Sequence, residues 1–204
     1  MTVEKSAQDP ARRLVIGLSG ASGAALGVRA LEACREMGVQ SHLVVSRAAL
    51  LTLQQEMGLG AAELTARADV RYPPGQVGAA IASGSFKTLG MLIAPCSVRT
   101  MSEIATGATS SLLTRAADVT LKERRPLVLM VRESPLHLGH LRTMAALAEM
   151  GAIIAPPMPA FYAAPASVQD IVDQCVGRAL DLFGLDWSRV RRWGEALSAI
   201  GGEA

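Results

Sequence analysis

The sequence has 204 residues, which is enough for one sizeable domain with its own hydrophobic core. Half of the residues are hydrophobic but only 3% are aromatic, so we expect a core of aliphatic side chains. The net charge of +2 is too small to favour nucleic acid or a membrane surface as a partner, and any anion would have to be bound locally.

The cysteines and the first residues bear on the cellular compartment. Cys34, Cys96 and Cys175 are odd in number, far apart and outside any CxxC pattern, which argues against a disulfide framework and a structural zinc site. The opening MTVEKSAQDPARR is polar and lacks the apolar core of a signal peptide. No apolar run approaches the ~20 residues of a membrane span. We expect a soluble, cytoplasmic protein.

Along the chain, short apolar runs alternate with stretches of helical spacing. Residues 1–12 have the composition of a disordered tail. Segment 58–88 contains RYPPGQVG, which is incompatible with regular structure. The remaining patterns predict strands at 14–19, 42–45, 91–94, 127–131 and 152–155, and helices at 24–37, 47–57, 98–123 with a break near Gly107, 136–150 and 168–183.

These strands lack polar alternation, which indicates a sheet covered on both faces. Their alternation with helices predicts a single-domain α/β fold with a doubly wound, mostly parallel sheet over residues 13–195, followed by a tail at 196–204. In such folds ligands bind beyond the carboxyl ends of the strands, so the residues that follow each strand are the informative ones.

Small and hydroxyl-bearing residues follow the first three inner strands. GLSGASGA, residues 17–24, would let a ligand approach the backbone at a helix start, although it is neither GxGxxG nor GxxxxGKS and tight strand–helix packing explains it equally well. Ser46, Ser97 and Thr100 could each be an ordinary N-cap feature. Together, at one edge of the sheet, they suit a flavin or a nucleotide with its phosphate.

Charged residues flank the strand at 127–131. Arg132 could hold a phosphate through its planar fork, and Glu133 could exchange a proton, but a surface ion pair is the alternative interpretation. Lys122 is a candidate anion ligand, whereas we interpret Arg124 and Arg125 as ordinary surface charges.

Metal and hydrolase chemistry are not favoured. His137 and His140 are three residues apart on a predicted helix, but no further ligands occur at suitable positions, so no metal is expected. A Ser-His-Asp hydrolase would need a GxSxG elbow, which is missing. Cys96 is most simply a small buried hydrophobic residue.

Several motifs, in this order, resemble the UbiX flavin prenyltransferase family over roughly residues 13–195. They are GLSGASGA, LVVSRAA, SGSF, APCSVRT, LLTRAADVTLKERRPLVLMVRESPLHL, EMGAIIAPPMPAFY and DIVDQCVGRALDLFG. The resemblance implies a flavodoxin-like or Rossmann-like fold and homo-oligomers, commonly dodecamers, with sites at subunit junctions. It also implies metal-independent transfer of a dimethylallyl group from dimethylallyl monophosphate to N5 and C6 of reduced FMN. The product, prenylated FMN, would serve a UbiD-type decarboxylase.

The resemblance also assigns roles to residues. It implies catalytic roles for Glu133, Lys122, Glu56 and Trp193. The implied prenyl-phosphate contacts are Lys122, Arg132, Tyr162 and Arg178. The implied flavin contacts are Gly20, Ala21, Ser22, Ser46, Ser97, Val98, Arg99, Thr100 and Arg132.

Four places depart from the family pattern, and two other functions remain open. The departures are Leu26, Ser110-Ser111, Arg142-Thr143 and Ala163-Ala164; the last is expected to open the pocket near Tyr162, and the others to alter subunit contacts. The open alternatives are a non-catalytic flavin carrier for a decarboxylase and a flavin-dependent decarboxylase of the same fold. A carrier would have no reason to keep Lys122, Glu133 and Arg178 together.

Overall fold

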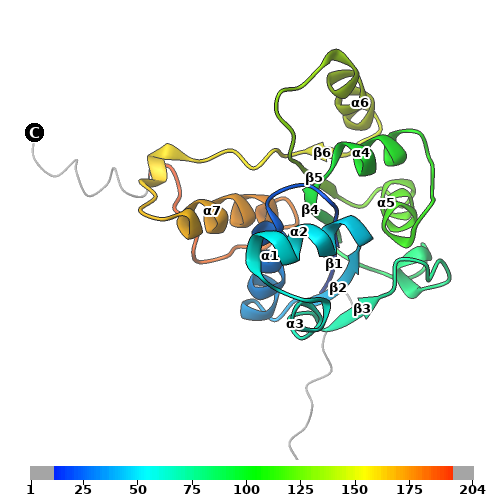
Figure 1. The fold of residues 1–204 in the computed structure, drawn as a ribbon, viewed down its shortest axis with the longest axis horizontal. Coiled ribbons are helices and arrows are strands. Elements are labelled where there is room, and N and C mark those ends of the chain that lie inside the picture. The colour runs from blue at the N-terminus through cyan, green and yellow to red at the C-terminus, as the bar shows by residue number, and fades with distance from the viewer. Residues whose placement is uncertain (1–11, 195–204) are drawn as a thin grey trace, which may run out of the picture.

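A computed structural model describes residues 12–194, which form a sheet with helices on both faces (Figure 1). The sheet has six strands in the order β3-β2-β1-β4-β5-β6, and every neighbouring pair is parallel. The expected doubly wound α/β fold is therefore confirmed. The strands are β1 (Arg13–Leu18), β2 (Gln40–Val45), β3 (Val70–Tyr72), β4 (Gly90–Cys96), β5 (Leu127–Val131) and β6 (Ile153–Ile154).

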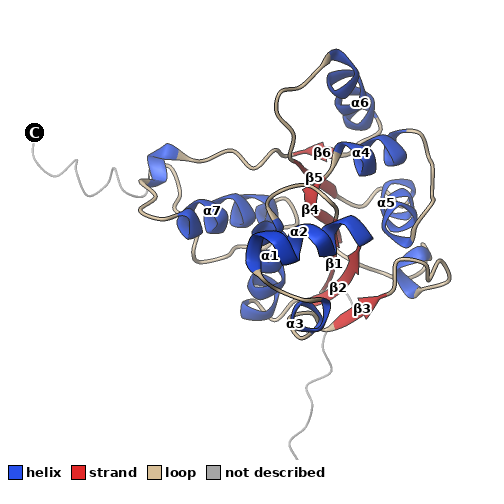
Figure 2. Ribbon diagram, viewed as in Figure 1, coloured by secondary structure: helices blue, strands red, loops and turns tan. Residues whose placement is uncertain are grey.

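The helices divide between the two faces of the sheet (Figure 2). One face packs against α1 (Ala24–Glu36), α2 (Arg47–Met57), α3 (Ala61–Thr65) and α7 (Val168–Asp181). The other face packs against α4 (Val98–Ala105), α5 (Leu112–Lys122) and α6 (Leu138–Glu149). None of the helices in residues 12–194 has the length and apolarity needed to span a membrane.

Both faces of the sheet are apolar because the two helical layers bury both sets of strand side chains. Leu14, Ile16 and Leu18 of β1 belong to the core on the α1 and α7 side. Val15 belongs to the core on the α4 and α5 side. On that side Gly17 leaves room for Met91 and Ile93 of β4, since a Cβ at Gly17 would lie 3.1 Å from the Met91 side chain. The uninterrupted apolar run in the sequence thus follows from two-sided burial.

The segments that gave no clear pattern contain short elements. Region 58–88 forms α3, the edge strand β3 and the turn η1 (Ala80–Ala82), and loop 156–165 contains η2 (Phe161–Ala163). Without β3, the strand order is that of flavodoxin; with β3, it is that of the dinucleotide-binding sheet. The predicted tails lie outside the described residues, except that Arg12 is described and its carbonyl accepts from Gln40.

Arg125 is not an ordinary surface charge, and that interpretation is wrong. Its guanidinium is partly buried and donates to the carbonyls of Phe86 (2.7 Å) and Gly84 (2.9 Å) and to the Thr88 hydroxyl (3.1 Å). It therefore ties the SGSF segment to the start of β5. Arg124 is exposed, as expected, with a φ of 55°.

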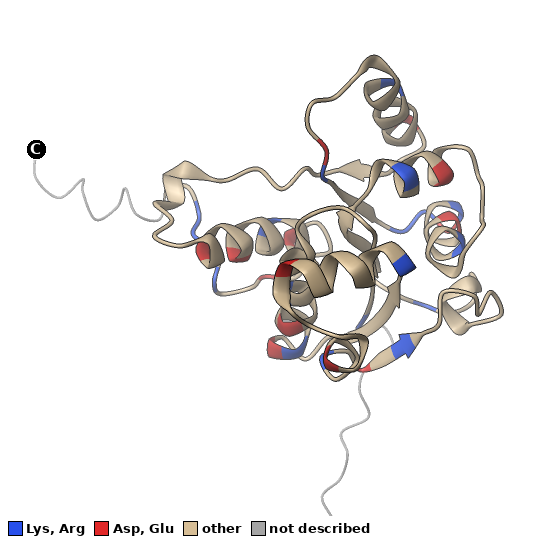
Figure 3. Cartoon of the chain, viewed as in Figure 1, with Lys and Arg blue, Asp and Glu red and all other residues tan. Residues whose placement is uncertain are grey.

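The segment after α7, Trp187–Gly194, runs back along α7 and α1, and we call it the C-terminal strap (Figure 1). Trp187 is buried, and its indole N–H donates to Glu36 at 2.8 Å. The Arg29 guanidinium lies over the Trp187 ring and pairs with Asp173 of α7 at 2.7 Å. Acidic and basic residues accordingly lie side by side along α1, α7 and the strap (Figure 3).

His42 of β2 is a buried neutral imidazole. Gln40 Oε1 accepts from Arg13, so the amide oxygen faces His42 Nε2 at 3.2 Å and requires a proton there. His42 Nδ1, 2.9 Å from the Tyr72 hydroxyl, is then the acceptor. Burial and, to a smaller extent, the charge of Arg13 lower the pKa of His42 to about 4.

We predict that the His42→Gln variant will lose part of the pH dependence of folding stability. In the unfolded chain this histidine has an ordinary pKa of ~6.5 and takes up a proton between pH 7 and 5. In the native state the buried His42 stays neutral over most of that range. The contribution of His42 to the free energy of unfolding is therefore fully present above pH ~6.5, and it falls by up to about 3 kcal/mol as the pH drops toward 4. Urea unfolding at several pH values measures it; the same slope in wild type and variant would contradict the prediction.

Candidate functional site

A cleft of about 760 Å³ opens at the carboxyl edge of the sheet. Its lining comes from the loops after β1, β2, β3, β4 and β5, together with the starts of α2, α4 and α5. The strand order reverses between β1 and β4, so the cleft lies at the topological switch point where α/β sheets bind ligands. The predicted residues that line it are Gly20, Ala21, Ser22, Ser46, Ser97, Val98, Arg99, Thr100, Arg132 and Glu133.

Ser19 joins the two loops that flank the switch point, a role that was not predicted from the sequence. Its side chain is 1% exposed; its hydroxyl donates to the Pro95 carbonyl at 2.9 Å and accepts from Ser97 N–H at 2.7 Å. The loops after β1 and β4 are thereby held at a fixed separation. The available signal was a polar residue at the end of an apolar strand.

The hydroxyl residues at the helix starts are both N-caps and cleft residues. Ser46 accepts from Ala49 N–H at 3.1 Å, and Ser97 accepts from Thr100 N–H at 3.3 Å. The two alternatives left open by the sequence are therefore compatible, because both capping serines also line the cleft.

Glu56 occupies the helix start at which the GLSGASGA loop would let a ligand approach the backbone. Its carboxylate accepts from Gly23 N–H at 2.9 Å and Ala24 N–H at 2.8 Å, the free donors at the start of α1. Burial raises the pKa of this carboxyl, but hydrogen bonds from Ser22, Ala24 and Gly23 outweigh it and hold the pKa below its usual value. The N-terminus of α1 is therefore capped internally, and only Gly20, Ala21 and Ser22 of the loop line the cleft.

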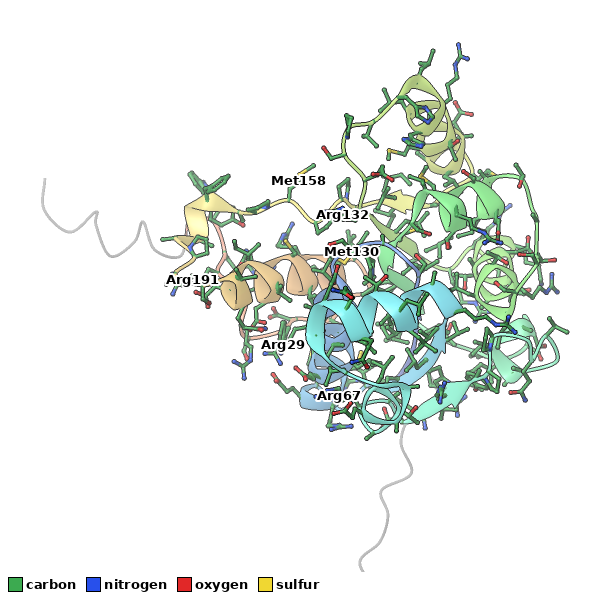
Figure 4. The ribbon with its side chains drawn as sticks, viewed as in Figure 1. Arg29, Arg67, Met130, Arg132, Met158 and Arg191 are labelled. Carbon is green, nitrogen blue, oxygen red and sulfur yellow. The ribbon has the colours of Figure 1, made fainter. Side chains whose placement is uncertain are left out.

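Arg132 and Glu133 lie at the rim of the cleft, directly after β5. The Arg132 N–H donates to the Cys96 carbonyl at 3.1 Å, which fixes the backbone there. Glu133 accepts from Ser134 N–H at 3.0 Å, and no salt bridge joins Arg132 to Glu133 within residues 12–194. The alternative of a surface ion pair is thus not supported. Figure 4 shows Arg132 near the centre of the molecule.

The other predicted phosphate contacts do not share this cleft within one chain. Lys122 ends α5, whose eleven residues span about 16 Å, whereas the start of α5 lines the cleft. Lys122 instead pairs with Glu123 beside Gly84. Arg178 lines a separate, smaller cavity of about 110 Å³ with Met130 and Met158, and it pairs with Asp181.

Tyr162 and Trp193 form a pair on the far side of α7. Their rings meet edge to face, with centroids 5.3 Å apart, and both side chains are exposed. The Tyr162 hydroxyl is 3.3 Å from Gln174 of α7. In a single chain this pair is therefore also separate from the cleft.

Several cleft residues had not been predicted, and they include one of the four departures. Ser110 accounts for part of the rim and donates to Glu103 at 2.8 Å, while Ser111 is the N-cap of α5. This departure, expected to alter a subunit contact, lies at the cleft, whereas Leu26, for which the same was expected, is buried in the core. The lining residues that were missed are Arg47, Ala48, Pro74, Gly75, Glu103, Ser110, Ser111, Leu113 and Thr114.

Ala163, from another departure, lines a cavity of about 240 Å³ behind the Tyr162 turn. In residues 12–194 we find no group of three or more His, Cys, Asp or Glu side chains able to hold a metal ion. His137 caps α6 through Nδ1, and its ring stacks on His140.

Comparison with known proteins agrees with this architecture. The profile of the Flavoprotein family matches residues 2–180. Flavin prenyltransferase UbiX of Escherichia coli K12 is 54% identical over 175 residues, which cover 85% of this chain and 93% of the relative.

Two solved structures are also similar. AnUbiX in complex with FMN and dimethylallyl pyrophosphate has a TM-score of 0.88 at 44% identity, covering 90% of this chain and 97% of that one. A dodecameric FMN-dependent UbiX-like decarboxylase from Escherichia coli O157:H7 has a TM-score of 0.86 at 48% identity, covering 89% of this chain and 98% of that one. The chain therefore belongs to the Flavoprotein family and, within it, to the UbiX flavin prenyltransferases.

Proposed function

We propose that the cleft binds FMN and that the enzyme joins a dimethylallyl group from dimethylallyl monophosphate to N5 and C6 of the reduced flavin. The observation that carries the proposal is the donor set at the switch point. The cleft combines hydroxyls from three separate loops with the guanidinium of Arg132, as a ribityl chain and a phosphate require. Its volume of about 760 Å³ falls in the range of small-molecule sites. AnUbiX, with FMN bound, has the same fold.

Reduced flavin, when bound, supplies the nucleophile and the electron-rich ring. The residues of the chain place the two substrates and stabilise the departing phosphate, which leaves with the bonding electron pair as the carbon–oxygen bond breaks. Cationic and O–H donors suit that role, namely Lys122, Arg132, Arg178 and Tyr162. Glu133, which lines the cleft beside Arg132, would exchange a proton with the phosphate.

Assembly accounts for the separation of these groups in one chain. A homo-oligomer would bring Lys122, Arg178 and Tyr162 of neighbouring copies to the cleft of each subunit. The dodecameric relative supports such an assembly. Helix α6 supports it too: it buries only Leu147, whereas Leu138 and Leu141 are exposed.

The role of Glu56 is to hold the flavin loop in shape, on this proposal, because its carboxylate is already engaged by backbone N–H groups. Trp193, which contacts Tyr162, would close the prenyl side of the site. The product would be delivered to a UbiD-type decarboxylase. The flavin-carrier alternative predicts flavin binding without any chemistry. The decarboxylase alternative would need a histidine near the flavin, but His42 lies buried against Tyr72 and Phe86.

The direct test supplies the enzyme with reduced FMN and dimethylallyl monophosphate under anaerobic conditions. We predict release of inorganic phosphate and a flavin that is heavier by one five-carbon unit, because both events belong to the same bond exchange. Phosphate assay and mass spectrometry of the extracted flavin measure them. Tight flavin binding with neither event would support the carrier function instead.

We predict that Glu56→Ala will weaken FMN binding about 2- to 30-fold, since removal of a helix cap costs ~0.5–2 kcal/mol. Titration of apoprotein with FMN measures the affinity. Glu63→Ala is the matched control, because Glu63 accepts from Gly60 N–H at 2.7 Å at the start of α3, outside the cleft. Equal losses of flavin affinity in the two variants would contradict a specific role of Glu56 in shaping the flavin loop.

Subunit mixing tests the shared site. Lys122→Ala and Arg132→Ala should each abolish most phosphate release when assayed alone. The two variant proteins are then mixed in equal amounts, dissociated and reassembled. The mixture should regain activity, because roughly a quarter of the sites would combine an intact Lys122 from one copy with an intact Arg132 from another. Arg124→Ala mixed with Arg132→Ala is the control and should behave as a simple dilution. No recovery in the first mixture would place both residues in the same subunit's site, contrary to the proposal.

A further inference from the structure

Gln174 is a buried polar side chain at the junction of three segments. It belongs to α7, is 5% exposed, and contacts both the Tyr162 turn and the C-terminal strap. Its amide nitrogen lies 3.0 Å from the Arg191 carbonyl and 3.3 Å from the Tyr162 hydroxyl, and its amide oxygen lies 3.0 Å from Arg191 N–H. Figure 4 shows Arg191 at the end of α7 that lies far from Arg132.

The orientation of the Gln174 amide follows from the partner groups. The Arg191 N–H can only donate, so the Gln174 oxygen must face it, and the Arg191 carbonyl can only accept, so an amide N–H must face that. The second amide hydrogen then points at Tyr162 Oη. Any reversal of the amide would place like groups against each other at both Arg191 atoms.

This orientation leaves the Tyr162 hydroxyl hydrogen unused. A phenol has one O–H donor, and here its oxygen accepts from Gln174. Among residues 12–194 the structure shows no acceptor for that hydrogen. A hydroxyl that accepts from the protein and has a free hydrogen is a donor for an anion, and polarisation by the first hydrogen bond strengthens the second.

The surroundings hold this arrangement in place. Arg191 donates from its guanidinium to the Ala163 carbonyl at 2.8 Å, which joins the strap to the turn that carries Tyr162. Asp173, which precedes Gln174 in α7, is paired with Arg29 of α1 at 2.7 Å. Helix α7, the turn and the strap are thus linked through short polar contacts around Gln174.

We propose that Gln174 is a positioning residue that fixes the Tyr162 hydroxyl as a hydrogen-bond donor to the phosphate of the prenyl substrate. The inference rests on the proposed function, since it assigns the anion to dimethylallyl monophosphate. It also explains why an amide is needed. A carboxylate at position 174 would accept the Tyr162 hydrogen itself, and an apolar side chain would only leave the hydroxyl without its partner.

Gln174→Glu, Gln174→Met and Tyr162→Phe, singly and combined, test the inference. Phosphate release at saturating FMN gives the KM for dimethylallyl monophosphate, and calorimetric titration of the FMN-loaded enzyme gives its affinity. We expect Gln174→Glu to weaken both about tenfold, Gln174→Met to weaken them less, and FMN affinity to stay unchanged. In the Tyr162→Phe background, Gln174→Glu should add less than about twofold, because the two changes act through one hydroxyl.

A purely structural role for Gln174 gives a different pattern. Gln174→Met and Gln174→Glu would then weaken the binding of dimethylallyl monophosphate to the same extent with or without the Tyr162 hydroxyl, because both changes disturb the contacts with Arg191. Full additivity of either change with Tyr162→Phe would overturn the inference.

Failure of the proposed function can be distinguished from failure of this inference. If the wild type released no phosphate, the proposed function would fail, and the titration alone would decide the role of Gln174. Unchanged affinity for dimethylallyl monophosphate in Gln174→Glu would then overturn it. A loss that requires an intact Tyr162 would support it.

Discussion

The parallel pairing of β1 with β4 is the constraint on which the site depends. Because all six strands run in the same direction, their carboxyl ends meet at one edge, and five loops distant in sequence converge there. The reversal of strand order between β1 and β4 separates the following helices to opposite faces and leaves a cleft between them. Ser19 then locks the two central loops together through Pro95 and Ser97.

The use of the helix N-termini at this edge is not uniform. The start of α1 is neutralised by Glu56 from α2, which leaves a ligand to interact with the loop before it and not with the helix end itself. The starts of α2 and α4 are capped by Ser46 and Ser97, whose hydroxyls remain available to the cleft. The site thus favours a ligand with many hydroxyl and phosphate oxygens over a single bare phosphate at one helix end.

Much of this could be predicted from the sequence, because two-sided burial leaves long apolar runs and because strand ends are visible as the points where small and polar residues begin. Three features could not. The short strand β3 has too few residues to show a pattern. The partners of Arg125 are two carbonyls and a hydroxyl 37 to 41 residues away, so nothing local marks it as buried. The capping of α1 by Glu56 depends on how α2 packs against α1, which no spacing reveals.

The separation of Lys122, Arg178 and Tyr162 from the cleft has the same origin. Lys122, Arg178 and Tyr162 lie on α5, α7 and η2, and on the proposed assembly other copies of the chain bring these side chains to the cleft. The most direct test is an experimental structure of the assembled protein with FMN and dimethylallyl monophosphate bound. The account predicts that Arg132 of one copy and Lys122 of a neighbour will both lie within hydrogen-bonding distance of one phosphate. A phosphate bound by residues of a single chain, with Lys122 still paired to Glu123, would contradict it.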